Sequence, residues 1–351
     1  MTLESSEISR VLLLCALSFA FAFAATPLYL RLLRQWKIGK AIRPTKEAPV
    51  FCMLHEKKIG TPTMGGVVVW ATVLTLAVVF YSVAQSDPGA LISHLNFLSR
   101  SETWLPLGAL VASALVGFVD DYFNVKGIGA HGGGLRARYR LLVYTAVAAV
   151  GAWWFWEKLD WDLLHVPFVG DFNIGWWYVP FFMLTIVATA FSVNETDGLD
   201  GLAGGTLFTS FGAFAIIAFA QGRYDLAAFC GVIIGALLAF LWFNIHPARF
   251  FLGDTGAMSL GVTLGVVALL TNSALFLPII GLVFVLESLS VILQIVWRKL
   301  FGKKLFLSAP FHHHLEARGW PEPQIVMRMW VISMVCAAVG IALALMDALI
   351  S

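Results

Sequence analysis

Residues 191–205, FSVNETDGLDGLAGG, combine side chains that suit the binding of a charged ligand. The segment lies between two apolar runs and carries one amide, Asn194, and three carboxylates, Glu195, Asp197 and Asp200. Charges beside membrane-like runs usually serve a polar ligand, because an unpaired charge there is costly. A plain polar turn is the alternative, and three acids without a basic residue make it the poorer one. The three-residue spacing of Asn194, Asp197 and Asp200 predicts that they share one helix face.

Two further acidic sites follow the same arrangement. Asp120 and Asp121 come directly after Val119, where an apolar run ends. Adjacent carboxylates at a membrane border suit Mg²⁺, which takes oxygen ligands, although a water-exposed helix end is the alternative. Asp254 stands at the start of another apolar run, where it could cap a helix or bind a metal.

Basic residues lie in the same loops as these acids. Lys58 precedes a Gly/Thr/Pro segment that could hold a phosphate or a nucleotide, although a flank of positive charge beside a span would look the same. Arg136 and Arg140 are four residues apart and should share a helix face, where they could meet anionic lipid or substrate phosphate.

Three consecutive histidines, His312, His313 and His314, follow the last of the basic loops. Adjacent residues cannot easily share one metal ion, so we expect imidazoles that face a diphosphate; a solvated cluster is the alternative. Glu287 lies inside a predicted span, where it serves either function or a hydrogen bond to a neighbouring helix.

The composition predicts an all-α, polytopic membrane protein. Of 351 residues, 59% are hydrophobic and only 13% are charged, whereas soluble domains have about 25% charged residues. The apolar runs are continuous rather than alternating, which excludes a β-barrel. Four scattered cysteines without a CxxC pair predict neither a disulfide framework nor a zinc site.

About ten membrane spans are predicted within a single domain that covers residues 1–351. Their bounds are Ser9–Leu33, Gly65–Ala84, Trp104–Val119, Leu141–Phe155, Tyr178–Val193, Thr206–Ala220, Leu226–Phe243, Ser259–Leu270, Ala274–Trp297 and Met329–Leu349. Alternate loops then hold 19 of the 23 Lys and Arg residues, and positive loops are cytoplasmic. Both termini should therefore face outward, and every polar group named above should lie on the cytoplasmic side. The aromatic-rich segment 156–177 on the outer side is predicted to be an anchoring loop.

Carboxylates for Mg²⁺ and basic groups for phosphate at one membrane face indicate phosphoryl transfer between a soluble and a lipid substrate. A transporter is the alternative from another class, but it should place its acids near the bilayer midplane, often within repeats. No P-loop or Rossmann fingerprint is present.

Five motifs resemble those of the bacterial phospho-N-acetylmuramoyl-pentapeptide transferases, a branch of the polyprenyl-phosphate N-acetylhexosamine-1-phosphate transferases. In chain order they are KIGTPTMGG (58–66), FVDDY (118–122), NETDGLDGLAGG (194–205), FNIHPARFFLGDTGAMSLG (243–261) and APFHHHLEARGWPEP (309–323). The acidic motifs occur throughout the superfamily, whereas TPTMGG and PFHHHLE are more specific to the muramoyl branch. A relative that uses UDP-GlcNAc is therefore the weaker alternative.

The resemblance implies the substrates UDP-MurNAc-pentapeptide and undecaprenyl phosphate, the products lipid I and UMP, Mg²⁺ as cofactor and the bacterial inner membrane as location. It also implies a possible homodimer and no nucleic-acid partner. The catalytic residues would be Asp120, Asp121 and His312 to His314, with Asp254 as metal ligand. The substrate-binding residues would be Lys58, Thr63, Asn194, Asp197, Gly198, Leu199, Asp200, Asn244, Phe251 and Gln294. Relatives often carry a basic cluster after the paired acids, whereas residues 124–131 contain only Lys126.

The mechanism expected from these roles is direct attack by undecaprenyl phosphate, with Asp120 or Asp121 as the base. A two-step route through a phospho-aspartate is the rival.

Overall fold

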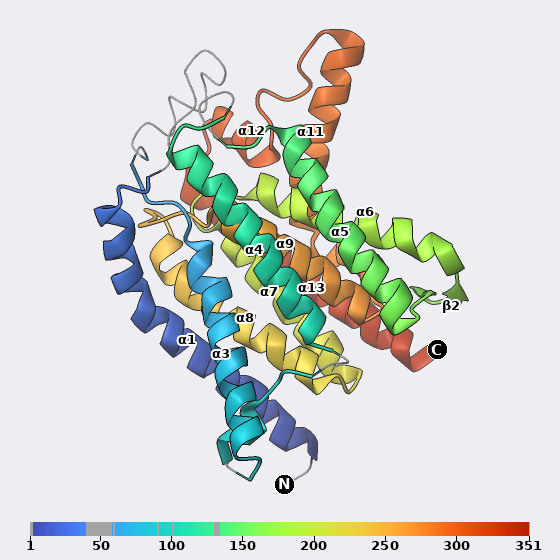
Figure 1. The fold of residues 1–351 in the computed structure, drawn as a ribbon. Helices are drawn as coiled ribbons and strands as arrows, with labels where there is room; N and C mark the ends of the chain where they lie inside the picture. Colours follow the sequence, from blue (N-terminus) through green and yellow to red (C-terminus); the bar gives the residue numbers. More distant parts are fainter. Residues whose placement is uncertain are drawn as a thin grey trace.

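A computed structural model (Figure 1) describes residues 3–39, 58, 60–89, 91–99, 102–129 and 134–350, and most of these residues lie in helices. The longer helices are α1 (Leu3–Gln35), α3 (Gly66–Ser86), α4 (Trp104–Val125), α5 (Ala137–Leu159), α6 (Tyr178–Thr196), α7 (Leu202–Ala220), α8 (Tyr224–Asn244), α9 (Gly253–Leu270), α11 (Leu282–Phe301) and α13 (Glu322–Ile350). The short elements are η2 (Leu91–Leu95), η3 (Gly175–Trp177), η4 (Ala274–Phe276), α10 (Leu277–Ile280), α12 (Phe311–Ala317) and the strands β1 (Leu163–Val166) and β2 (Gly170–Asn173).

Eight helices of the described ranges are long and apolar enough to cross a membrane: α1, α3, α4, α6, α7, α8, α9 and α13. The bent pair α10 and α11 would be a ninth span. This confirms a polytopic helical membrane protein. Helix α5, which covers the predicted span Leu141–Phe155, is not among them, so the count of ten and the outward termini stay predictions. Both chain ends lie away from α12 (Figure 1).

Helices α8 and α9 form the centre of the bundle. In their spanning stretches 83% and 89% of the residues are buried, against 22% in α1. Helix α8 packs on α1 and α7, and α9 packs on α4 and α6. Both central helices are apolar around their whole circumference, as expected for a helix enclosed by others. Because other helices surround α9, the residues of its first turn lie against neighbouring helices.

Among the helix ends that differ from the predicted ones, two concern the acids. Helix α4 continues to Val125, so Asp120 and Asp121 lie within its last turns and not beyond its end. Helix α9 begins at Gly253, so Asp254 lies in its first turn rather than before it. The prediction placed these acids outside the apolar runs because charge is costly there. Partners from other helices make their burial tolerable.

The predicted ninth span, Ala274–Trp297, is broken. Helices α10 and α11 are bent by 84° at Gly281, which lies between them. Pro278 stands in the first turn of α10. A Cβ at Gly281 would lie 3.1 Å from the carbonyl oxygen of Leu277, so the bend leaves little room for a side chain there.

The aromatic-rich segment 156–177 is more ordered than the predicted loop. Strands β1 and β2 form an antiparallel hairpin with Leu163 opposite Asn173. His165 lies between Asp171, 2.7 Å away, and Asp347 of α13, which ties the hairpin to the last helix. Three of the four cysteines, at 15, 230 and 336, are free, in agreement with the prediction, and Cys52 lies outside the described residues.

Close approach of α8 to α1 depends on Gly235, since a Cβ there would lie 2.1 Å from the carbonyl oxygen of Cys15. We expect Gly235→Ala to lower the free energy of unfolding by about 2 kcal/mol through overpacking. Gly212→Ala in α7 is the matched control, because a Cβ there meets nothing within 4 Å. Thermal unfolding in detergent measures both, and equal melting temperatures would contradict the expectation.

Candidate active site

Two of the predicted acids converge on one cation. Arg140 of α5 forms ion pairs with Asp120 of α4, with Nε 2.7 Å from Oδ2, and with Asp254 of α9, with Nη2 2.9 Å from Oδ2. Asp120 also accepts a hydrogen bond of 2.5 Å from the backbone N–H of Leu135. We call Asp120, Asp121 and Asp254 the acid cluster. The guanidinium of Arg140 therefore offsets part of the negative charge of the acid cluster.

Asp121 is held more rigidly than its neighbour. Its side chain accepts a hydrogen bond of 2.9 Å from the backbone N–H of Thr255, in the first turn of α9. The hydroxyl of Thr63 lies 3.4 Å from its other oxygen. A carboxylate at a helix N-terminus satisfies free N–H groups and suits the helix dipole. Capping, one of the two roles considered for Asp254, therefore belongs to Asp121.

Gly253 makes this contact possible. Its φ is +74°, and a Cβ there would lie 2.6 Å from Oδ2 of Asp121. Its backbone N–H donates a hydrogen bond of 3.1 Å to Asp197. A side chain at this position would strain the backbone and displace the acid.

Asn194, Asp197 and Asp200 do not share one helix face, so that prediction was wrong. Helix α6 ends at Thr196 and α7 begins at Leu202, which leaves a turn at 197–201. The amide of Asn194 donates a hydrogen bond of 2.6 Å to Asp254. The chain turns at the glycines of this segment. Asn194 and Asp197 then contact the start of α9, whereas Asp200 contacts Lys58.

Asp200 belongs to a second group, which we call the Lys58 cluster: Lys58, Asp200, His246 and Glu322. The ammonium of Lys58 lies 2.6 Å from Asp200 Oδ1 and 2.5 Å from Glu322 Oε1. His246 Nδ1 lies 3.0 Å from the other oxygen of Asp200. Burial alone would raise the pKa of Asp200, but the charge of Lys58 and these hydrogen bonds outweigh it and lower that pKa.

A metal ion is not needed in the Lys58 cluster. Among the described residues, Asp200, His246 and Glu322 are the one set of three or more His, Cys, Asp and Glu side chains placed closely enough to share one. Since the ammonium of Lys58 already lies between the two carboxylates, it takes the place of a cation.

A backbone contact joins the first polar loop to the start of α9. Phe251 donates from its N–H to the carbonyl of Pro62 over 2.8 Å and accepts from the N–H of Gly65 over 2.7 Å. This pairing brings Thr63 to the acid cluster and Lys58 to within 5.8 Å of the Phe251 ring centroid. The acid cluster and the Lys58 cluster therefore both adjoin the paired backbone of Phe251 and residues 62–65.

The three histidines contact different partners. His312 is fully buried, and its Nδ1 lies 2.9 Å from Glu287, which confirms the hydrogen-bonding alternative for that acid. His313 pairs with Glu316 over 2.6 Å. His314 accepts from the N–H of Leu307 and does not face the acids.

His312 also explains a glycine in the turn. A Cβ at Gly198 would lie 2.1 Å from Nε2 of His312, so only glycine fits there. Nε2 itself is buried without a hydrogen-bond partner among the described residues. The first histidine therefore lies against the turn that carries the polar residues.

Several predicted substrate-binding residues contact backbone groups or apolar side chains of the protein. The side-chain amide of Gln294 donates a hydrogen bond to the carbonyl of Phe306 and accepts hydrogen bonds from the N–H groups of Leu305 and Phe306. Leu199 is buried in an apolar cluster with the start of α13. Asn244 accepts from the N–H of Gly201 over 3.0 Å and donates to the carbonyl of Phe250. Lys126, the basic residue expected near the paired acids, is exposed and lies over the ring of Tyr122.

Comparison with known proteins agrees with this geometry. Residues 103–272 match the family described as glycosyl transferase family 4. A phospho-N-acetylmuramoyl-pentapeptide-transferase of Chloroflexus aggregans is 40% identical over 97% of this chain and 90% of the relative. Proteins of that name from a Geobacillus species and from Shouchella clausii are 38% and 39% identical, over 93% and 94% of this chain and 95% and 96% of the relatives. The chain belongs to the phospho-N-acetylmuramoyl-pentapeptide transferase family.

Two site residues of this family member were missing from the predicted set. Arg140 was considered only for lipid or phosphate contact, yet it is the cation of the acid cluster. Glu322 was not singled out, yet it holds Lys58. The position of Glu322 within the quoted motif GWPEP was the available signal, whereas nothing in the spacing of Arg140 distinguished it from Arg136.

The pair of His312 and Glu287 gives this transferase family member a specific pH dependence. Burial on its own would lower the pKa of His312, but the charge and hydrogen bond of Glu287 prevail and raise it. A raised folded-state pKa stabilises the fold fully below the ordinary value of about 6.5, and this stabilisation is lost as the pH rises through the raised pKa.

We therefore expect the melting temperature of the wild type to fall relative to that of Glu287→Gln as the pH rises above about 6.5. Thermal unfolding in detergent at a series of pH values measures this. Every other histidine is present in both proteins, so their effects cancel in the comparison. Parallel profiles would show that the pair does not titrate with folding.

Proposed function

We propose that this protein transfers phospho-MurNAc-pentapeptide from UDP-MurNAc-pentapeptide to undecaprenyl phosphate in the bacterial cytoplasmic membrane. The products are undecaprenyl-diphospho-MurNAc-pentapeptide, or lipid I, and UMP. The observation that carries the proposal is the pairing of an acid cluster with an adjacent Lys58 cluster, in a chain 36–40% identical to such transferases over nearly its whole length.

The Lys58 cluster is the proposed site for the uridine of the donor. Phe251 is half-buried and offers a ring face on which a base can stack. Lys58 and the turn at 197–201 add charged and backbone hydrogen-bonding groups beside that ring. With the uridine held here, the diphosphate would extend toward the acid cluster, because the pairing of Phe251 with Pro62 joins the two groups.

The acid cluster fits a Mg²⁺ ion by the chemistry of its donors. Oxygens of Asp120 and Asp254 are both held within 2.9 Å of one guanidinium, and the amide of Asn194 adjoins them. Carboxylate and amide oxygens are the ligands that suit this ion. We propose Asp254 as its ligand; when bound, the ion would neutralise charge on the diphosphate.

Asp120 is better placed than Asp121 to act as the base. Asp121 is committed to the first turn of α9, whereas Asp120 faces Arg140, whose guanidinium can transfer its contacts to an incoming phosphate. Asp120 takes the proton of undecaprenyl phosphate. The freed phosphate oxygen bonds to the sugar-side phosphorus of the donor, and the bond from that phosphorus to the oxygen of UMP breaks.

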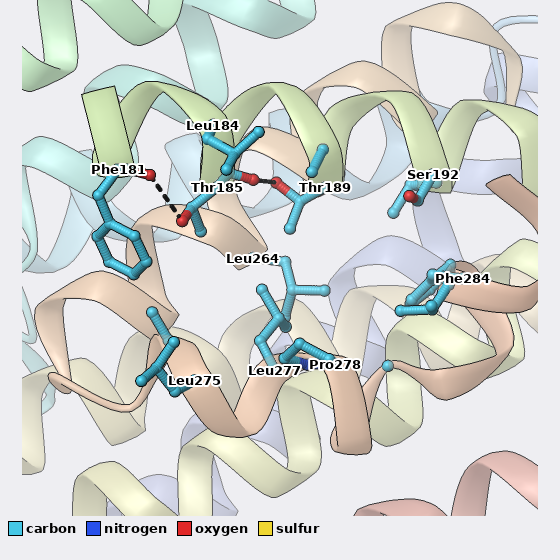
Figure 2. A pocket seen from close by; sticks show the side chains of 15 residues that line it. Phe181, Leu184, Thr185, Thr189, Ser192, Leu264, Leu275, Leu277, Pro278 and Phe284 are labelled. Carbon is cyan, nitrogen blue, oxygen red and sulfur yellow. Dashed lines mark hydrogen bonds between the residues drawn. The ribbon is translucent and has the colours of Figure 1, made fainter. Parts of the chain in front are cut away.

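An apolar groove gives the prenyl chain a place beside the acid cluster. It has an empty volume of about 690 Å³ and lies between α6, α9 and the bent pair α10 and α11. Figure 2 shows that the hydroxyls of Thr185 and Thr189 bond to carbonyls of their own helix, which leaves an apolar wall. The groove ends at Ser192 and Val193, directly before Asn194. From Phe181 to Ser192 the helix rises about 17 Å, so part of a prenyl chain can lie along it.

UMP release distinguishes the proposed donor from its alternative. Purified protein in detergent with undecaprenyl phosphate and Mg²⁺ should release UMP from UDP-MurNAc-pentapeptide and not from UDP-GlcNAc. Release from UDP-GlcNAc alone would keep the chemistry and reject the muramoyl donor. No release from either donor would reject the function. Acid-labile phosphate trapped on Asp121 without the lipid would replace direct attack by the two-step route.

Metal removal and one substitution test the acid cluster. EDTA should abolish UMP release, and Asp254→Asn should lower kcat on the order of 100-fold or more, because a lost metal contact removes several kcal/mol of charge stabilisation. Asp160→Asn is the matched control, since Asp160 is exposed at the far end of α5. Full activity of Asp254→Asn at ordinary Mg²⁺ concentrations would reject Asp254 as the ligand.

A further inference from the structure

Glu322 is the first residue of α13 and contacts two distant segments of the chain. Its Oε1 accepts a hydrogen bond of 2.5 Å from the ammonium of Lys58 and one of 2.7 Å from the backbone N–H of Asp200. Its Oε2 lies 3.4 Å from Nδ1 of His246. The side chain is only 10% exposed, so these charged contacts form largely out of water, where they are strong.

These contacts fix the direction of the Lys58 side chain. A lysine side chain is long and flexible and loses considerable rotamer freedom when it is held. Here two carboxylates hold its ammonium, Asp200 at 2.6 Å and Glu322 at 2.5 Å, beside the ring of Phe251. With Glu322 removed, one carboxylate would be left, and the ammonium could turn away from the ring.

Glu322 also fixes the backbone of the turn at 197–201. It binds the N–H of Asp200, while Asn244 binds the N–H of Gly201 and Trp330 of α13 donates to the Gly201 carbonyl over 3.1 Å. The start of α13 is itself anchored, because Ile325 and Val326 pack with Leu199. The turn is therefore held by residues of both α8 and α13.

A purely local role explains these contacts less well. An acid in the first turn of a helix favours that helix through its dipole. The contacts of the Glu322 carboxylate, however, run to Lys58, Asp200 and His246, none of which belongs to α13. A helix-start role requires none of them.

We infer that Glu322 is a positioning residue for the uridine part of the nucleotide, acting through Lys58 and the Asp200 backbone N–H. This inference rests on the proposed function, which places uridine at the Lys58 cluster. The uridine is remote from the phosphorus that reacts, so its contacts are the same in the ground state and the transition state. Losing them raises KM and leaves kcat nearly unchanged.

Binding of radiolabelled UMP to the purified full chain tests this directly, beside KM and kcat for the UDP-sugar. Glu322→Gln removes the charge that faces Lys58 but keeps an oxygen for the Asp200 N–H. It should raise the Kd of UMP and the KM of the donor about tenfold, and Glu322→Ala should raise them further. The KM for undecaprenyl phosphate should not change. The control is Asp225→Asn, which breaks an ion pair of 2.5 Å with Arg10 at the opposite end of α8.

A double-substitution cycle separates positioning from mere stability. In a Lys58→Met background, Glu322→Gln should change the Kd of UMP by no more than about twofold, because its partner is already lost. Additive effects, or an unchanged Kd in the single variant, would overturn the inference while leaving the function intact.

The two proposals can fail separately. A wild type that binds UMP with this dependence on Glu322 but transfers no sugar phosphate would overturn the function and keep the pocket. A wild type that neither binds UMP nor transfers would overturn both.

Discussion

The arrangement of the site depends on the cost of gathering three carboxylates inside a helical bundle. Asp120, Asp121 and Asp254 repel one another, and water screens them poorly because the first two are buried and Asp254 is only partly exposed. The protein offsets this with Arg140 and with amide donors, which are the backbone N–H groups of Leu135 and Thr255 and the side-chain amide of Asn194. The cluster therefore exists only where the start of α9 meets α4 and α5, and the remaining helices are arranged so that this meeting point is enclosed.

Close backbone approach makes that meeting point possible. A Cβ at Gly117 of α4 would lie 2.4 Å from the carbonyl oxygen of Asp254, and one at Gly66 of α3 would lie 2.2 Å from the Cα of Gly256. Small residues at helix contacts are the usual way to bring membrane helices together, since lipid is as apolar as the side chains it would replace. In this protein the same closeness places donors from one helix within hydrogen-bonding reach of acids on the next.

Sequence alone could predict the elements and the acids, but not their partners. Continuous apolar runs indicated the helices. Charge rules identified Asp120, Asp121 and Asp254, although they ended α4 too early and began α9 too late, since they cannot foresee that an N–H of another helix will stabilise an acid inside one. Arg140 and Glu322 were not predicted as site residues because their places in the two clusters depend on contacts with residues 20 to 264 positions away in the chain. The break at Gly281 was not predicted because a single glycine within an apolar run is compatible with an unbroken helix.

The division into two clusters also separates recognition from chemistry. The turn at 197–201 contributes Asp197 to the start of α9 and Asp200 to the Lys58 cluster, so one rigid segment sets the spacing between them. Groups on the Lys58 side would contact the donor equally before and during reaction, whereas groups of the acid cluster would face charge that changes in the transition state. A shift of the turn would affect both halves together, whereas a substitution that leaves the turn in place would affect only its own half. The buried contact of His312 with Gly198 bears on the turn itself, which is why a residue outside both clusters can influence each of them.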